Sequence, residues 1–348
     1  MIYLVIGFIL IIFSYLEIIE YKKWFSVFIL SLACIFLVLF AALRDGAVVG
    51  TDSPAYYFNY IYPFWNTEPA YKFLNILFSK KLEANYNVFL LFLNACSLFL
   101  MWKYFKKNSV FLILPLLIFY SDLYLYFNIS GIRQAMAISF TSFSLYYAFH
   151  KNLKYFLICI ILAAMFHVSS LVFVFAYFIP RNTLKFKYII WLSALFVGAV
   201  YIGNILSTRF EYLASKADYY TKYQVQAENI EFLYVIGILK RSIILLLAFM
   251  YRKLLFHDQQ FVYYFNLYLV GFLIFISTYL ISPDFGVRFS VYYTIVDCVL
   301  AGYMLFLVKD IRKRIFIVTV FAAVSIYKLF GYMDSEFYTY KSIIQNFL

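Results

Sequence analysis

The sequence predicts an all-α polytopic integral membrane protein, a helix bundle of about 11–12 hydrophobic segments. Of its 348 residues, 66% are hydrophobic and 13% are charged, and the mean hydropathy is +0.85. Apolar runs of about 17 to 25 residues, each long enough to cross a bilayer as a helix, recur along the chain. The longest intervals between these runs, 44–85 and 208–231, are too short for a soluble domain. We therefore expect one transmembrane domain over 1–348, without a nucleotide-sugar-binding or nucleic-acid-binding module.

Apolar runs place the spans near 2–19, 24–43, 86–102, 109–126, 129–149, 188–207, 232–250, 261–281, 289–308 and 315–331. The first run has no basic region before it and no small-residue cleavage site after it, so we expect it to remain as a helix. The stretch 155–180 fits two interpretations. It is either one long crossing or a hairpin of two helices that meet at His167, each only ~18 Å long.

The distribution of positive charge favours the hairpin. If 155–180 turns back, 16 of the 29 Lys and Arg residues fall in six short cytoplasmic loops, at 22–23, 103–107, 151–154, 181–187, 252–253 and 309–314. A single crossing would move the last three loops outside and remove the asymmetry that cytoplasmic loops usually show. We therefore predict a re-entrant hairpin at 155–180, both termini outside, and outer-face loops at 44–85 and 208–231.

Candidate functional residues begin in the first outer loop. It starts at Leu43-Arg44, continues through Val49-Gly50-Thr51-Asp52 and reaches Glu68-Pro69. Arg44 could bind an anion, although arginines at helix ends are also ordinary interfacial anchors. Asp52 and Glu68 each precede a helix-start pattern, so each carboxylate could instead cap a helix.

Three further arginines lie in or near outer segments. Arg133 follows Asn128-Ile129-Ser130-Gly131 in the first turn of a helix, where a cation opposes the helix dipole unless an anion binds there. Arg241 interrupts the span 232–250, and Arg288 ends an outer loop where Asp284 is an alternative ion-pair partner. With no DxD or His-rich motif in the chain, these arginines predict a metal-free pocket for a polyanion such as a diphosphate.

His167 is the only histidine inside an apolar stretch. An ionisable residue within a membrane segment is a functional hypothesis by default, although a lone histidine often only packs and hydrogen-bonds. No second His or Cys has metal-ligand spacing, so we expect no metal and no cofactor. The cysteines lie singly inside apolar runs and are predicted to be small core residues.

In their order along the chain, these pieces resemble the EpsG/Wzy-type family of exopolysaccharide and O-antigen polymerases. The matching pieces are Leu43-Arg44, Val49-Gly50-Thr51-Asp52 with Tyr56, Glu68-Pro69-Ala70-Tyr71, Ile132-Arg133-Gln134-Ala135, Ala163 to Ser170 around His167, Arg288 with Tyr292 and Tyr293, and Tyr340-Lys341-Ser342-Ile343. Each piece is short, and the ordered set carries the resemblance. Arg241 matches no motif of the family, so its assignment rests on its place within a span.

The resemblance implies a glycosyltransferase of the bacterial inner (cytoplasmic) membrane. It would join lipid-linked repeat units on the periplasmic face during exopolysaccharide, capsule or lipopolysaccharide biosynthesis. Donor and acceptor would both be glycans on undecaprenyl diphosphate. Membrane lipids and a chain-length regulator are further partners that it allows, whereas nucleic acid is not expected.

We expect Arg44, Arg133 and Arg288, helped by Arg241, to hold the diphosphate as negative charge develops on it. Asp52 or His167 would accept the proton of the acceptor hydroxyl, with Asp52 favoured. Weaker sugar contacts are assigned to Tyr56, Glu68 and Tyr340.

Two other functions are weighed against this one. A lipid-linked oligosaccharide flippase would need no general base and usually shows two repeated halves, which this sequence lacks. A membrane acyltransferase that modifies the polysaccharide could also use a membrane histidine. The sequence leaves open the sugar, the linkage, and whether the configuration at the transferred carbon is retained or inverted.

Overall fold

The computed structural model describes residues 1–63, 67–183, 230–280 and 282–343. These residues form helices joined by short loops, with no strand among them apart from one isolated antiparallel bridge between Arg44 and Ser342. The predicted all-α class is confirmed. The predicted span 188–207 and loop 208–231, except for its last two residues, lie outside the described residues.

The chain divides into two compact units, Met1–Tyr177 with Asp297–Leu348, and Phe178–Val296. The single transmembrane domain over 1–348 stays a prediction.

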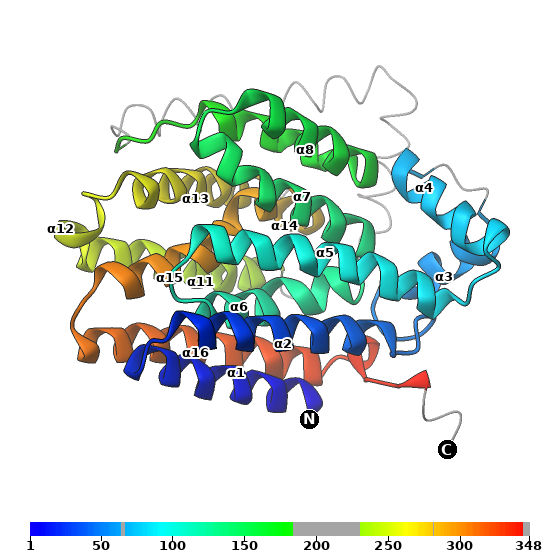
Figure 1. The fold of residues 1–348 in the computed structure, drawn as a ribbon, viewed down its shortest axis with the longest axis horizontal. Coiled ribbons are helices and arrows are strands. Elements are labelled where there is room, and N and C mark those ends of the chain that lie inside the picture. Colours follow the sequence, from blue (N-terminus) through cyan, green and yellow to red (C-terminus); the bar gives the residue numbers. More distant parts are fainter. Residues whose placement is uncertain (64–66, 184–229, 281, 344–348) are drawn as a thin grey trace. The chain divides into compact units, whose positions relative to one another are not determined.

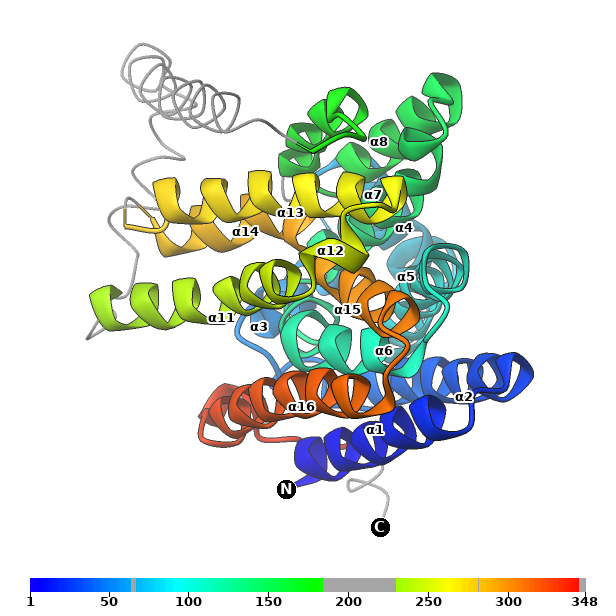
Figure 2. The same ribbon diagram turned by 90° about the vertical axis from the view of Figure 1, so that its left-hand side faces the viewer.

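Long helices of the first unit lie side by side. Helix α1 (Ile2–Ile19) packs against α16 (Ile311–Met333) and α6 (Ile113–Phe119), as both views show (Figures 1 and 2). Helix α2 (Lys23–Ala42) packs against α5 (Tyr86–Asn108), which packs against α7 (Ile132–Phe149), and α7 packs against α8 (Leu153–Phe166). The remaining elements of this unit are α3 (Ser53–Ile61), α4 (Pro69–Ile76), η1 (Leu77–Lys81), η2 (Tyr120–Asn128), η3 (Val168–Phe178), α15 (Val296–Leu307) and η4 (Glu336–Tyr338).

The second unit contains α11 (Ile230–Met250), α12 (Arg252–Leu255), α13 (Gln259–Thr278) and α14 (Pro283–Thr294). Helices α13 and α14 pack closely, because a Cβ at Gly271 would lie 2.7 Å from Cβ of Tyr293. Only glycine permits this approach.

Seven described helices are long and apolar enough to cross a membrane. They are α1, α2, α5, α11, α13, α16 and the segment Pro283–Leu307, which consists of α14 and α15. Each corresponds to a span predicted from the sequence. The predicted span 109–126 begins later, at Ile113, and continues as a π-helix to Asn128.

Two carboxylates that the sequence did not single out join elements of the first unit. Glu17, 1% exposed, accepts hydrogen bonds from the backbone N–H groups of Leu112 and Ile113, at 2.8 and 3.0 Å. It thus satisfies donors that helix α6 leaves unpaired at its N-terminus. Asp122 in η2 forms an ion pair with Lys328 in α16, at 3.4 Å.

The chain reverses direction at His167. Helix α8 ends at Phe166, and the 3₁₀-helix η3 brings Tyr177 back to the start of α8, where its hydroxyl donates to the carbonyl oxygen of Lys151 at 2.9 Å. The rings of Tyr177 and Phe156 also lie 5.5 Å apart. With 14 residues, α8 is about 21 Å long, too short to cross the hydrocarbon core alone. The predicted hairpin is confirmed, and the side from which it enters stays a prediction.

The predicted topology can be tested by cysteine labelling in a variant whose four native cysteines are replaced by serine. Asn182→Cys and Gln259→Cys should resist an impermeant thiol reagent added outside intact cells, whereas Ser335→Cys should react. After the membrane is permeabilised, all three should react, which controls for accessibility. Labelling of Asn182→Cys from outside would overturn the orientation.

Candidate functional site

Arg44 is almost fully buried, with 1% of its surface exposed. Its guanidinium donates to three backbone carbonyl oxygens, those of Ala41, of Val49 at 3.4 Å and of Ile129 at 2.6 Å. One side chain therefore ties the end of α2, the loop that follows it and the segment before α7. Because these oxygens accept its hydrogen bonds and no surface is left open, the structure gives Arg44 a structural position beneath the site. A diphosphate could reach it only if the loop opened.

The same loop is held by residues near the C-terminus. The N–H of Asp45 donates to Lys341 O at 2.8 Å, and the N–H of Gly50 donates to Phe337 O at 2.8 Å. Tyr340 stacks on Phe40 with 4.3 Å between ring centroids and donates its hydroxyl to the carbonyl of Phe40. In this structure Tyr340 therefore packs on α2, and the sugar contact predicted for it stays a prediction.

Asp52 lies in a turn that is fixed against the start of α7. Its backbone N–H donates to Oγ of Ser130 at 2.9 Å, and the hydroxyls of Thr51 and Ser130 are 2.7 Å apart. Gly50 permits the turn because its φ is +112° and a Cβ there would lie 3.0 Å from Ile129 O. The Asp52 side chain makes no cap hydrogen bond with α3, so the capping interpretation is not supported.

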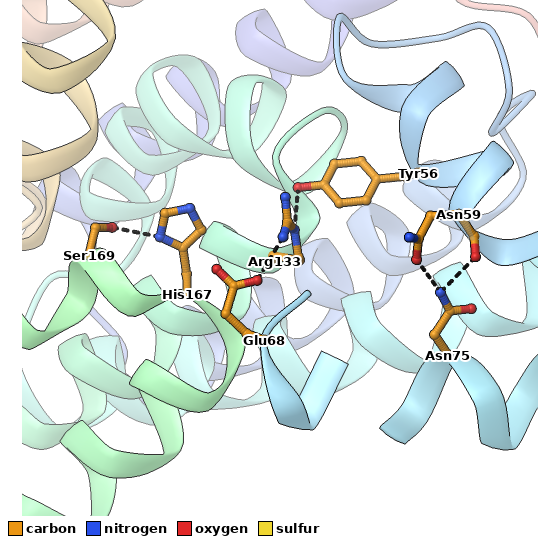
Figure 3. Close-up of polar contacts among 7 residues, drawn as sticks. All are labelled: Tyr56, Asn59, Glu68, Asn75, Arg133, His167 and Ser169. Carbon is orange, nitrogen blue, oxygen red and sulfur yellow. Dashed lines mark hydrogen bonds and ion pairs between the residues drawn. The ribbon is translucent and has the colours of Figure 1, made fainter. Parts of the chain in front are cut away.

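Glu68, Arg133 and Tyr56 form the centre of the candidate site (Figure 3). Arg133, in the first turn of α7, donates to Glu68 Oε2 at 2.7 Å and to the Tyr56 hydroxyl at 3.2 Å. Its guanidinium carbon lies 5.3 Å from the ring centroid of Tyr56 and 5.8 Å from that of Tyr71. The side chains of Arg133 and Glu68 are 28% and 18% exposed, so solvent and substrate can reach the pair.

The Tyr71 hydroxyl is an unused hydrogen-bonding group near Arg133. Its side chain is fully buried, and the hydroxyl has no hydrogen-bond partner among the described residues. Burial raises the pKa of Tyr71 well above its ordinary value. The phenol therefore stays protonated at physiological pH and remains a hydrogen-bond donor.

His167 lies in the same region. Helix α4 packs against α8, and in Figure 3 the Glu68 carboxylate lies between the His167 ring and the Arg133 guanidinium. Nδ1 of His167 is 2.6 Å from Oγ of Ser169, and this contact fixes the orientation of the imidazole ring. Ser169 was not among the residues predicted for the site, although its place two residues after His167 was the available signal.

A buried asparagine pair joins the two short helices between α2 and α5. Nδ2 of Asn75 in α4 donates to the side-chain and backbone oxygens of Asn59 in α3, at 2.5 and 3.1 Å (Figure 3). Asn59 follows Tyr56 by three residues and Asn75 follows Tyr71 by four, so the pair lies one helical turn from the tyrosines beside Arg133. Neither asparagine could be selected from the sequence, because the contact joins different helices.

The other two predicted arginines belong to the second unit. Nη2 of Arg288 lies 3.7 Å from Oδ2 of Asp284, and this is the alternative ion pair considered from the sequence. Arg241 donates to Gly237 O at 3.2 Å, and its guanidinium carbon lies 3.6 Å from the ring centroid of Phe275. A pocket formed by four arginines stays a prediction. Within the described residues, no three His, Cys, Asp or Glu side chains are placed to hold a metal ion.

Helices able to span a membrane, together with a charged and aromatic cluster carried by loops and helix ends, define a multi-pass membrane protein. The model of the EpsG family matches residues 27–342, and the chain belongs to that family. Membership supports a role in exopolysaccharide biosynthesis, broadly of the polymerase type, for an enzyme similar to glycosyltransferases. No curated protein and no solved structure matches the chain.

The structural position of Arg44 leads to a stability prediction. Arg44→Met should remove the guanidinium hydrogen bonds to three buried carbonyl oxygens and lower the free energy of unfolding by on the order of 2–5 kcal/mol. Arg133→Met, at a partly exposed site, should cost less. Thermal unfolding of both purified variants in detergent would measure the difference. If Arg44→Met unfolds like the wild type yet loses activity, Arg44 contacts the substrate instead.

Proposed function

We propose that this protein is a polysaccharide polymerase that joins oligosaccharide repeat units carried on undecaprenyl diphosphate. Family membership supports the polymerase class. The observation that carries the proposal is Arg133, a partly exposed cation at the start of α7 that Glu68 and Tyr56 hold in place. A guanidinium beside the N–H groups of a helix N-terminus suits a phosphate-bearing leaving group.

In the proposed reaction, an acceptor hydroxyl oxygen bonds to the anomeric carbon of the donor glycan as the bond from that carbon to the diphosphate breaks. Arg133 would stabilise the negative charge that develops on the diphosphate. Glu68 and Tyr56 would keep the guanidinium oriented before the substrate binds. The diphosphate contacts expected of Arg288 and Arg241 stay predictions from the sequence, and Arg44 would act by positioning the loop.

The proton of the acceptor hydroxyl must pass to a base. We retain Asp52 for this role, because its turn is fixed by Ser130 while its carboxylate is not committed to capping α3. His167, oriented by Ser169, would position the acceptor or bond the diphosphate. The arginines take the place that a metal ion has in other glycosyltransferases, since the sequence has no metal-binding motif.

The enzyme would lie in the bacterial inner membrane, with both termini and the Arg133 site on the periplasmic face. Its donor and acceptor would be exported lipid-linked units, and a chain-length regulator would be a further partner.

A deletion strain would separate polymerase from flippase. We expect it to accumulate single repeat units on lipid, exposed on the outer side of the membrane, with no long polymer. Wild-type protein should restore the polymer. Repeat units trapped on the cytoplasmic side would indicate a flippase and contradict the proposal.

In the same strain, Arg133→Ala should lower turnover of lipid-linked units by roughly 2–4 kcal/mol of transition-state free energy, the scale of one preorganised donor. Arg133→Lys should restore little, because lysine cannot reproduce the planar guanidinium. Arg312→Ala, on the first turn of α16, serves as the matched control and should retain activity. Normal polymerisation by Arg133→Ala at wild-type abundance would refute the diphosphate role.

The base assignment can be tested with Asp52→Asn and His167→Gln, assayed in vitro on lipid-linked units across pH. Asp52→Asn should abolish most turnover at every pH, because it removes the proton acceptor. His167→Gln should raise KM more than it lowers kcat, because glutamine can still hydrogen-bond but holds the acceptor less well. The opposite pattern would make His167 the base.

A further inference from the structure

The second unit contains a cavity that takes no part in the proposed reaction. It has a volume of about 900 Å³ and lies among α11, α12, α13 and Thr183. Its size falls in the range of ligand-binding pockets. Helix α12 is the short link between α11 and α13 (Figure 2), so the cavity lies where two membrane-spanning helices meet at a turn.

The lining of this cavity changes from apolar to basic along its length. Along the two long helices it is apolar, with Leu245 and Phe249 on α11 and Phe265 and Leu269 on α13. At the turn it is basic, with Arg252, Lys253 and His257. None of the described lining residues is acidic.

The junction between the apolar and basic parts is well defined. The guanidinium carbon of Arg252 lies 5.0 Å from the ring centroid of Phe249. Phe249 is 66% exposed and Leu246 is 61% exposed, so the cavity opens on an apolar surface of the helix. An amphipathic molecule with an anionic head and a long apolar chain fits this gradient.

We propose that this cavity binds an anionic phospholipid. Its phosphate would contact Arg252, Lys253 and His257, and one acyl chain would lie along Leu245 and Phe265. Basic pockets between membrane helices are known to bind lipid headgroups of this charge. On the topology predicted from charge, the basic end faces the cytoplasmic leaflet.

Charge complementarity favours an anionic over a zwitterionic headgroup. Arg252 and Lys253 are cationic side chains, and both would repel the ammonium of a zwitterionic lipid. The acidic residue closest in sequence, Asp258, accepts the backbone N–H of Phe261 at 2.8 Å and so caps α13. Its single negative charge can offset only one of the two positive charges of Arg252 and Lys253.

The test uses the full-length protein purified in detergent, with phosphatidylglycerol or phosphatidylcholine of matched chain length added. Native mass spectrometry counts the bound lipids. The wild type should retain phosphatidylglycerol in preference to phosphatidylcholine, and Arg252→Gln with Lys253→Gln should lower phosphatidylglycerol occupancy roughly tenfold. Arg312→Gln with Lys313→Gln makes the same charge change on the first turn of α16 and should leave occupancy unchanged.

A second variant tests the apolar part of the cavity. Ser242, which lines the cavity, can be changed to Phe, which fills the space but keeps all three basic residues. Ser242→Phe should also lose phosphatidylglycerol, while unfolding at the wild-type temperature when no lipid is added. Equal losses in the two paired charge variants, or full retention by Ser242→Phe, would show surface attraction instead of a bound lipid and would overturn the proposal.

Discussion

The candidate site depends on the buried guanidinium of Arg44. A charge removed from water must find hydrogen-bond partners inside the protein, and Arg44 finds three backbone carbonyl oxygens on three segments. The loop after α2 is thereby fixed against residue 129, and Ser130 can then hold the turn of Asp52. Because α7 begins two residues after Ser130, the same contacts set the position of Arg133.

Most of the helices could be predicted from the sequence, because bilayer thickness fixes the length of apolar helices. The apolar pattern allowed either one crossing or a turn at His167, and the positions of lysines and arginines favoured the hairpin. The late start of α6 could not be predicted in this way. It depends on Glu17, which caps α6 from a helix almost a hundred residues earlier.

The site was predicted in part. Arg133, Glu68, Tyr56 and His167 were selected from separate motifs, and the structure gathers them around the first turn of α7 and the end of α8. Asn59, Asn75 and Tyr71 were missed as site residues, since an asparagine or tyrosine becomes informative only when its partner on another helix is known. Arg44 shows the reverse, because sequence reveals the charge of a residue but not the carbonyl oxygens that surround it.

The bridge between Arg44 and Ser342, with the backbone bonds from Asp45 to Lys341 and from Gly50 to Phe337, joins segments almost 300 residues apart. During synthesis of the chain, the loop after α2 is made long before its partner residues near the C-terminus. The Asp52 turn therefore gains its last backbone contacts only after residues 337–343 have been synthesised and have reached the same side of the membrane. Maturation of the site is thus coupled to insertion of α16, and a partly inserted chain would lack a finished site.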